Sequence, residues 1–343
     1  MKAKIQGGEK MGNHSKKTKK KQKGPVGLLI ICLIIISILG IYFGVKHTQT
    51  PEKTLETSSE IGNERNIQEQ GKQIQIFSGN DRPVACMIDN HSDAWPQYSI
   101  NDAYIVYEII VEGGETRLMA LFKGKEPEKV GPMRSSRHYF LDYALENDAI
   151  YAHIGWSPQA QSDISTLGIN NINGLEYDTG KEWKQGDVFW RLSTRKAPHN
   201  SILNIKTIKE TATKKGYSLT SNKKSVLKYV ADEFTLEDKI DKMSATNITI
   251  PFSTIQKVNF KYDSQTKRYT RYARTKLQTD ATTSTNITTK NIIITFAENY
   301  TLQDVEDKDR QGLKNIGTKN GYYITNGQAI PITCTKEARN SQT

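Results

Sequence analysis

An uncharged apolar segment near the N-terminus constrains this chain more than any other feature. Residues 26–45 read VGLLIICLIIISILGIYFGV and contain no charged side chain. In a helix, 20 residues that each rise about 1.5 Å span roughly the hydrocarbon core of a bilayer. Tyr42 and Phe43 lie near the C-terminal end of the segment, where aromatic rings favour the membrane interface. The segment therefore predicts a single transmembrane helix.

The residues before this segment indicate its orientation. Residues 1–23 hold nine lysines and one glutamate. Because lysine-rich flanks stay in the cytoplasm, residues 1–25 are predicted to form a basic cytoplasmic tail and the chain after residue 45 to be extracytoplasmic. A cleaved signal peptide is the competing interpretation, but its apolar core is shorter, about 7–15 residues, and ends at small residues. Cys32 lies inside the apolar run, which is not the position of a lipid-modified cysteine.

The net charge excludes one class of partner. The whole chain carries a formal charge of +11, and the tail accounts for eight of these charges, so the other 320 residues carry only three. A folded region so close to neutral has no electrostatic reason to bind a phosphate backbone. We therefore expect no nucleic-acid partner.

The cysteines and histidines show no spacing typical of a metal or cofactor site. We expect neither a metal nor a cofactor. Cys86 and Cys334 fall in different predicted domains, which favours two free thiols over a disulfide bond.

The chain after the membrane segment divides into a linker and two domains. Residues 46–80 are polar and are predicted to form a flexible linker. Residues 81–222 mix strand-like and helix-like patterns, with strands predicted over 83–89, 105–112, 117–124 and 149–155 and a turn at Gly113 and Gly114 between the second and third. Residues 245–337 are strand-rich and include a predicted hairpin over 257–263 and 267–273. The predicted fold class is α+β, with a single N-terminal transmembrane helix, a mixed α/β first domain and a smaller β-rich second domain.

Two arginine-rich segments of the first domain lie at or just before the start of a predicted helix. Residues 131–137 lie at the start of a helix predicted to begin at Ser135, and residues 191–200 lie before a helix predicted to begin at Ser201. Because a helix N-terminus offers unpaired N–H groups, guanidinium groups beside it favour binding of a carboxylate or phosphate. The predicted anion site consists of Arg134, Arg137, Arg191, Arg195, His199 and Asn200.

An equally weighted competing interpretation is that these arginines pair inside the fold with acids of the same domain, namely Asp89, Glu108, Glu112 or Glu115. Glu108 and Glu112 lie in an apolar strand-like run, where a carboxylate needs a partner. Histidines that follow strands or precede helices are candidates for a general base or a metal ligand. For any single histidine, however, a structural role is the preferred interpretation. The secondary candidates for the site are Asp89, His91, Glu108, Glu112 and His153.

Several motifs occur in an order that resembles one family. RPVACMIDNH, IVYEIIVEGGETRLMALF, GPMRSSR, AIYAHIGWSPQA and FWRLSTRKAPHN, which run from residue 82 to residue 200, resemble segments of the YerB-like lipoproteins. These are extracytoplasmic proteins of Gram-positive bacteria and are classed as a domain of unknown function. A weaker similarity continues through NFKYDSQTKRYTRY, NIIITFAEN and KNGYYITNGQAIPIT. The resemblance implies two extracytoplasmic domains and no established activity.

Two departures from the family pattern lead to further expectations. Family members typically end their leader in a lipidated cysteine, whereas this chain has the predicted membrane helix. Family members also continue beyond IPIT with more strand-like residues, whereas this chain ends soon after Cys334. We therefore expect the last strands of the second domain to be missing.

Three functional classes are open. The leading interpretation is a membrane-anchored extracytoplasmic protein that binds an anionic cell-envelope ligand. The second is a cell-envelope hydrolase or transferase that uses His and Arg residues of the first domain. The third is an interaction subunit of an envelope complex. The expected partners are the membrane, through residues 26–45, and either an anionic cell-wall ligand or an envelope protein.

The predicted topology can be tested with protease. A protease added to intact cells should digest the chain after about residue 50 and leave the lysine-rich tail intact, because only the tail is cytoplasmic. Immunoblotting with antibodies against the tail and against the second domain measures both parts. Release into the medium of a protein cut near residue 45 contradicts the membrane anchor.

Overall fold

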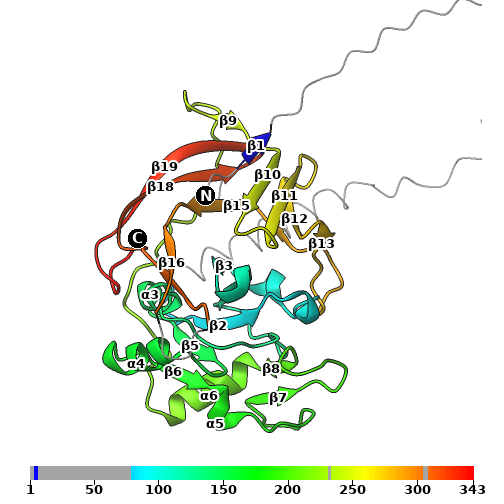
Figure 1. Cartoon of the computed structure of the whole chain (residues 1–343), viewed down its shortest axis with the longest axis vertical. Coiled ribbons are helices and arrows are strands. Elements are labelled where there is room, and N and C mark those ends of the chain that lie inside the picture. Colours follow the sequence, from blue (N-terminus) through cyan, green and yellow to red (C-terminus); the bar gives the residue numbers. More distant parts are fainter. Residues whose placement is uncertain (1–3, 7–78, 231–232, 304–307) are drawn as a thin grey trace, which may run out of the picture. The chain divides into compact units, whose positions relative to one another are not determined.

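The computed structural model describes residues 4–6, 79–230, 233–303 and 308–343 (Figure 1). The predicted transmembrane segment, nearly all of the predicted tail and most of the linker lie outside these residues. Among the helices in the described part of the chain, none is long and apolar enough to cross a membrane.

A five-stranded mixed sheet forms the centre of the first domain. Its strand order is β3 (Ile105–Ile110), β4 (Thr116–Phe122), β2 (Val84–Asp89), β5 (Ile150–His153) and β6 (Asn171–Asn173). Strands β2 and β3 each pair antiparallel with β4, whereas β5 is parallel to both β2 and β6. The strands predicted here from the sequence, including the paired strands β3 and β4 on either side of a glycine turn, are confirmed.

Both faces of this sheet are buried. Cys86 belongs to the same apolar cluster as Ile205 and Ile208, on one face, whereas Met87 belongs to a cluster with Phe140 and Ile164 on the other. This alternation explains why β2 is buried along its whole length. Cys86 and Cys334 are free thiols, as predicted. The remaining elements are α3 (Phe140–Glu146), α4 (Pro158–Thr166), α5 (Gly174–Tyr177), α6 (Ile205–Lys214), β7 (Phe189–Arg191), β8 (Ser201–Leu203) and three short 3-10 helices, Ser92–Ala94, Ile100–Asp102 and Glu112–Gly114.

The helix predicted to begin at Ser135 begins later. Helix α3 starts at Phe140, because the backbone before it is already paired. The N–H of Ser136 donates to the carbonyl of Gly155 at 2.9 Å, and the carbonyl of Ser136 accepts from Ser157 at 3.2 Å. Arg134 and Arg137 therefore lie in an extended segment beside β5 and not in the first turn of a helix.

The helix predicted to begin at Ser201 also begins later. Ser201 is the first residue of β8, which pairs with β7, and Asn204 caps α6 by accepting from the N–H groups of Lys206 and Thr207. Arg191 and the segment after it therefore precede a strand. The argument from helix N-termini, which supported the predicted anion site, fails at both positions.

The second domain is β-rich, as predicted, and consists mainly of two antiparallel sheets that share one core. Ile248 and Tyr269 of one sheet pack in a single cluster with Ile294 and Ile324 of the other. The first sheet contains β1 (Lys4–Gln6), β10 (Asn247–Pro251), β11 (Lys257–Asp263), β12 (Arg268–Ala273), β13 (Lys276–Leu277) and β14 (Thr288–Thr289). The second contains β15 (Asn291–Thr295), β18 (Gly317–Thr325), β19 (Gln328–Lys336) and β9 (Met243–Ser244), and a separate hairpin contains β16 (Asn299–Thr301) and β17 (Gln311–Leu313).

The pairing of strand β1 is incompatible with the predicted topology. Strand β1 pairs antiparallel with β10, and Ile5 lies opposite Ile248. This pairing requires residues 4–6 to be on the same side of any membrane as the second domain, whereas the predicted topology puts them in the cytoplasm. The two arrangements exclude one another within one chain, and protease protection of the tail distinguishes them.

Charged side chains join the two domains. The Nη2 atom of Arg271, on β12, lies 2.9 Å from the Glu108 carboxylate on β3. The Nζ atom of Lys336, on β19, lies 2.9 Å from the Glu146 carboxylate on α3, and both side chains are at most 2% exposed. An unpaired buried charge is strongly destabilising. The first domain therefore depends on the second for the cationic partners of Glu108 and Glu146.

This dependence predicts the effect of removing one cation. Lys336→Met should lower the free energy of unfolding by about 3–5 kcal/mol, because it leaves the Glu146 carboxylate buried without its cation. Urea unfolding of the full chain in detergent, followed by tryptophan fluorescence, measures the loss. The matched control is Lys314→Met, which removes an exposed pair with Glu298 and should cost less than about 1 kcal/mol. Equal costs for the two substitutions contradict the structural role of Lys336.

Candidate functional site

The loop that follows β2 is held in place by the buried amide of Asn90. Its Nδ2 atom donates to the carboxylate of Glu108 at 3.0 Å and to the hydroxyl of Thr116 at 2.7 Å. Its Oδ1 atom accepts from the indole of Trp95 at 3.2 Å and from Gln97 at 3.0 Å. Because the amide uses both donors and accepts twice, the loop cannot shift without breaking hydrogen bonds.

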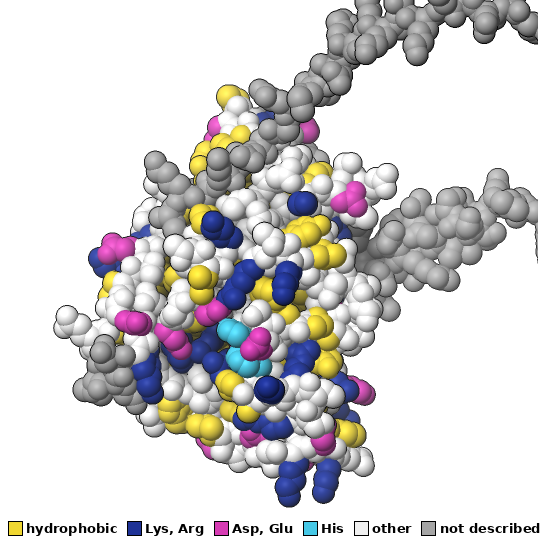
Figure 2. Space-filling model, turned by 45° about the vertical axis from the view of Figure 1, so that its right-hand side comes forward, with side chains coloured by type: hydrophobic (Ala, Val, Ile, Leu, Met, Phe, Trp, Pro, Cys, Tyr) yellow, Lys and Arg dark blue, Asp and Glu magenta, His cyan; other side chains and the backbone are white. Residues whose placement is uncertain are grey.

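This loop brings His91 next to His199. The centroids of the two imidazole rings are 4.7 Å apart and the ring planes are stacked at 20°. The carboxylate of Asp89 contacts both residues: it accepts from the backbone N–H of His91 at 3.0 Å and lies 2.7 Å from the Nδ1 atom of His199. The His91 side chain is 37% exposed and that of His199 is 15% exposed. Figure 2 shows histidine side chains on this face of the molecule, with acidic side chains beside them and basic side chains around them.

Backbone pairing brings Arg134 to the same place. The N–H of Asp89 donates to the carbonyl of Pro132, and the N–H of Arg134 donates to the carbonyl of Met87, at 2.8 and 2.9 Å. The Nε atom of Arg134 consequently lies 3.4 Å from the Asp89 carboxylate. Three segments far apart in the sequence therefore meet at Asp89, and each carries a residue predicted for the site.

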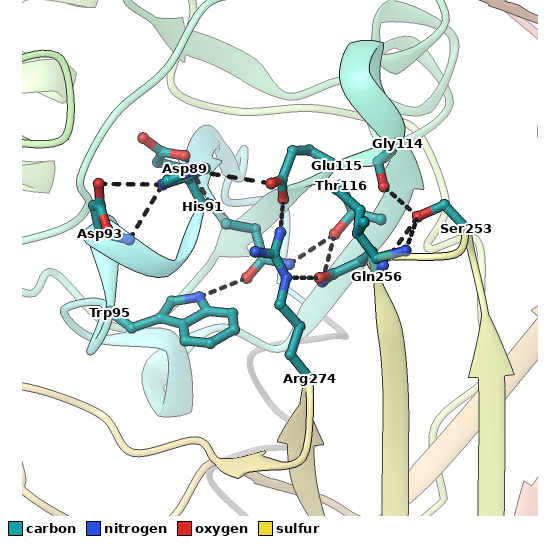
Figure 3. A network of polar contacts seen from close by, with 12 residues as sticks. Asp89, His91, Asp93, Trp95, Gly114, Glu115, Thr116, Ser253, Gln256 and Arg274 are labelled. Carbon is teal, nitrogen blue, oxygen red and sulfur yellow. Dashed lines mark hydrogen bonds and ion pairs between the residues drawn. The ribbon is translucent and has the colours of Figure 1, made fainter.

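Two further acids of the first domain, Asp93 and Glu115, lie near His91, and Arg274 of the second domain pairs with one of them (Figure 3). The His91 Nδ1 atom lies 3.7 Å from the Asp93 carboxylate, and its Nε2 atom lies 3.9 Å from the Glu115 carboxylate. Glu115 pairs with Arg274, which follows β12. Arg274 also donates to Gln256 at 2.8 Å and lies over the ring of Trp95. The second domain thus reaches the site through Arg274.

Arg137 pairs with an acid of the first domain. Its Nε atom donates to the carboxylate of Glu112 at 2.9 Å, and Arg117 donates to the same carboxylate at 3.1 Å. Although burial raises the pKa of Glu112, the hydrogen bond from Arg137 and the two guanidinium charges lower this pKa to about 2. Arg137 therefore pairs with an acid inside the fold, as the competing interpretation predicts, and the partly buried Glu112 is its partner.

Arg191 and Arg195 also have partners within the described residues. Arg191 donates to the carboxylate of Asp178 at 2.6 Å and to the side-chain oxygen of Asn200 at 3.0 Å. Arg195 donates to the carbonyls of Ala94 and Pro96, at 2.7 and 2.6 Å, and so ties the loop of His91 to the segment before β8.

The third candidate histidine, His153, lies in the core. Its Nδ1 atom contacts the carbonyl of Gly155 at 2.8 Å, and its Nε2 atom contacts the side chain of Asn171 at 3.2 Å. The side chain is fully buried, and burial lowers its pKa to about 4. These contacts favour the structural role over that of a general base.

The residues that meet can do two kinds of chemistry. The Asp89 carboxylate orients His199, which is the arrangement of a general base or of a metal ligand. One ligand atom from each of His91, Asp93 and His199 lies within 4.8 Å of the other two. Sequence reasoning missed Asp93 and Arg274. The spacing of His91 and Asp93, two apart in a polar loop, was the available signal for the former, and no local pattern marks the latter.

The low pKa of His153 predicts a pH dependence of stability. An unfolded histidine has a pKa of about 6.5, and that of folded His153 is about 4, so the unfolded state binds the proton more tightly. The stability that neutral His153 contributes is fully present above about pH 6.5, falls as the pH decreases below that value, and is lost once the pH has passed through 4. Between pH 7.5 and 5 this single residue should cost about 2 kcal/mol.

Urea unfolding at these two pH values checks the expectation. In His153→Gln the difference between the two pH values should be smaller by about 2 kcal/mol, whatever the variant's stability at pH 7.5. His138 also has a pKa lowered to about 4 by burial. It contributes the same pH dependence to the wild type and to His153→Gln, so its effect cancels in the comparison. An unchanged pH difference in the variant is the contrary outcome.

Comparisons with known proteins assign the family. The model described as "Protein of unknown function (DUF3048) N-terminal domain" matches residues 71–218, and that of the corresponding C-terminal domain matches residues 248–343. The protein named "Putative lipoprotein YerB" from Bacillus subtilis (strain 168) is 32% identical over 263 residues, which cover 73% of this chain and 76% of that protein. The crystal structure of the YerB protein from Bacillus subtilis aligns with a TM-score of 0.66 at 29% identity, and the alignment covers 77% of this chain and 84% of that one. The chain therefore belongs to the YerB-like family, with the DUF3048 N-terminal and C-terminal domains that its motifs predict.

Proposed function

We propose that this chain is a membrane-anchored extracytoplasmic protein that binds an anionic ligand of the cell envelope at Arg134 and the His91–His199 pair. Two observations support the location. Residues 26–45 are long and apolar enough to cross a bilayer. The Bacillus subtilis relative carries the name of a lipoprotein, and a lipoprotein is attached to a membrane by its lipid.

The observation that supports an anionic ligand is that the guanidinium group of Arg134 lacks hydrogen-bond partners in the part of the chain that the structure describes. Among the four arginines of the predicted site, Arg134 alone makes no side-chain hydrogen bond to any residue that the structure describes. Its contact with Asp89, at 3.4 Å, is longer than a hydrogen bond, and its Nε atom is buried without a partner. Because a guanidinium group offers five donors in a planar fork, Arg134 retains donors for a carboxylate or phosphate.

Arg134 is partly accessible to such a ligand. Its side chain is 25% exposed and approaches the same Asp89 carboxylate that contacts His199, whose side chain is 15% exposed. A bound phosphate or carboxylate gains charge-assisted hydrogen bonds, each worth about 1.5–3 kcal/mol in a partly buried site.

A hydrolase or transferase is the second candidate, and one contact favours it. Asp89 lies 2.7 Å from the Nδ1 atom of His199, so the other ring nitrogen is held in one orientation and can accept a proton. In such an enzyme Arg134 stabilises the developing negative charge and His199 acts as the general base.

One substitution tests the ligand proposal. Arg134→Gln should weaken binding at least about tenfold, which corresponds to about 1.4 kcal/mol. The measurement is calorimetric titration of the full chain in detergent with teichoic-acid fragments, which carry phosphate, and with peptidoglycan fragments, which carry carboxylate. The matched control is Arg268→Gln. It removes the same charge from an exposed arginine of β12 that donates to Thr288, and it should leave binding unchanged.

Two outcomes contradict the proposal. Equal losses for Arg134→Gln and Arg268→Gln indicate unspecific attraction by the net charge. A large loss of stability in Arg134→Gln, with wild-type binding of both fragments, makes Arg134 a structural partner of Asp89. Chromatography of the same mixtures for cleaved fragments tests the second candidate, since a binding protein releases no product.

A further inference from the structure

The group of His91, Asp93 and His199 suggests a function that the sequence motifs do not indicate. One ligand atom of each residue lies within 4.8 Å of the other two, and Figure 3 shows His91 and Asp93 side by side in the loop after β2. We propose that these three side chains bind one divalent transition-metal ion of the Zn²⁺ class. The expectation of no metal rested on local spacing, whereas His199 lies far from the other two residues in the sequence.

The surroundings of His199 suit a metal ligand. A histidine that binds a metal through one ring nitrogen usually donates the other N–H to a carboxylate. The Nδ1 atom of His199 lies 2.7 Å from the Asp89 carboxylate, which is only 4% exposed. The Nε2 atom of His199 makes no hydrogen bond to any residue in the described ranges. Asp89 thus holds the ring in the tautomer whose Nε2 lone pair is free.

The other two residues can complete the coordination by small movements. Zinc–nitrogen bonds of about 2.0–2.1 Å put tetrahedral ligands roughly 3.3 Å apart, so atoms up to 4.8 Å apart have to close by about 1.5 Å. His91 also has to turn, because its ring is stacked on that of His199. The side chains of His91 and Asp93 are 37% and 69% exposed, and a single 3.2 Å hydrogen bond to the backbone holds His91. Both are therefore free to move.

The local charge also favours a cation. The carboxylates of the cluster outnumber its guanidinium groups, so one negative charge remains when both imidazoles are neutral. The combination of two imidazoles with one carboxylate is typical of Zn²⁺ and similar ions, whereas Mg²⁺ and Ca²⁺ prefer oxygen ligands. The charged groups counted are Asp89, Asp93, Glu115, Arg134 and Arg274.

Three protein ligands leave a coordination position open for water or an anion. If the proposed function is correct, the metal ion and Arg134 contact the same anion. This is the one part of the inference that rests on the proposed function. Anion titrations with and without Zn²⁺ test this step. A Zn²⁺ titration without any anion tests the metal site, so each proposal can fail independently.

The metal site is tested on the untagged full chain in detergent, stripped with a chelator and dialysed against Zn²⁺ alone. We expect one Zn²⁺ per chain, measured by atomic absorption. His91→Ala and Asp93→Asn should each weaken binding at least tenfold, and Mg²⁺ at equal concentration should not compete. His91 is partly exposed and Asp93 is exposed, so both substitutions should leave the fold intact, which circular dichroism checks. The matched control is the double variant His14→Ala/His47→Ala, which should bind Zn²⁺ as the wild type does.

Two results overturn the metal site. One is the absence of stoichiometric Zn²⁺ binding by the wild-type chain. The other is binding that His91→Ala and Asp93→Asn leave unchanged, which identifies an adventitious ion held elsewhere, most directly if the double variant loses it.

Discussion

The structure depends on one electrostatic constraint, namely that acids of the first domain are buried against cations of the second. Glu108 meets Arg271 and Glu146 meets Lys336, in places where neither partner has more than slight access to water. A carboxylate in such a place is costly unless its cation is present and its remaining lone pairs accept hydrogen bonds. Glu146 satisfies both conditions, since Tyr107 also donates to it at 2.8 Å. The pairing therefore favours one placement of the second domain on the first.

The same constraint reaches the candidate site through a chain of hydrogen bonds. Glu108 accepts from Asn90, which holds the loop of His91, and from Thr116 at the start of β4. Thr116 in turn accepts from Gln256 of the second domain at 3.1 Å. Because Gln256 also accepts from Arg274, each link is a polar group that loses a partner if the domains separate. The position of the His91 loop is therefore a property of both domains together, although every residue predicted for the site lies in the first.

Local patterns were sufficient for most of the fold and insufficient for the site. The strands at 84–89, 105–110 and 116–122 follow from runs of apolar and β-branched residues, and the structure confirms them. The starts of two helices were wrong because backbone pairing at Ser136 and Ser201 is a tertiary feature that no capping pattern reveals. The meeting of His91 with His199 likewise depends on how distant segments pair. Residue type identified both histidines as candidates, but only the fold makes them neighbours.

Charge pairing distinguishes Arg134 from Arg137 and Arg191. Arg137 and Arg191 are paired with Glu112 and Asp178 at hydrogen-bonding distance, so an external anion has to displace an internal one before it can bind there. Among the residues that the structure describes, Arg134 forms an ion pair only with Asp89, at 3.4 Å, and the same carboxylate also orients His199. One carboxylate cannot fully satisfy a guanidinium group and an imidazole at once. Next to Asp89 and within the described part of the chain, Arg134 therefore retains unpaired donors and His199 retains a ring nitrogen without a hydrogen bond, and both can contact a ligand.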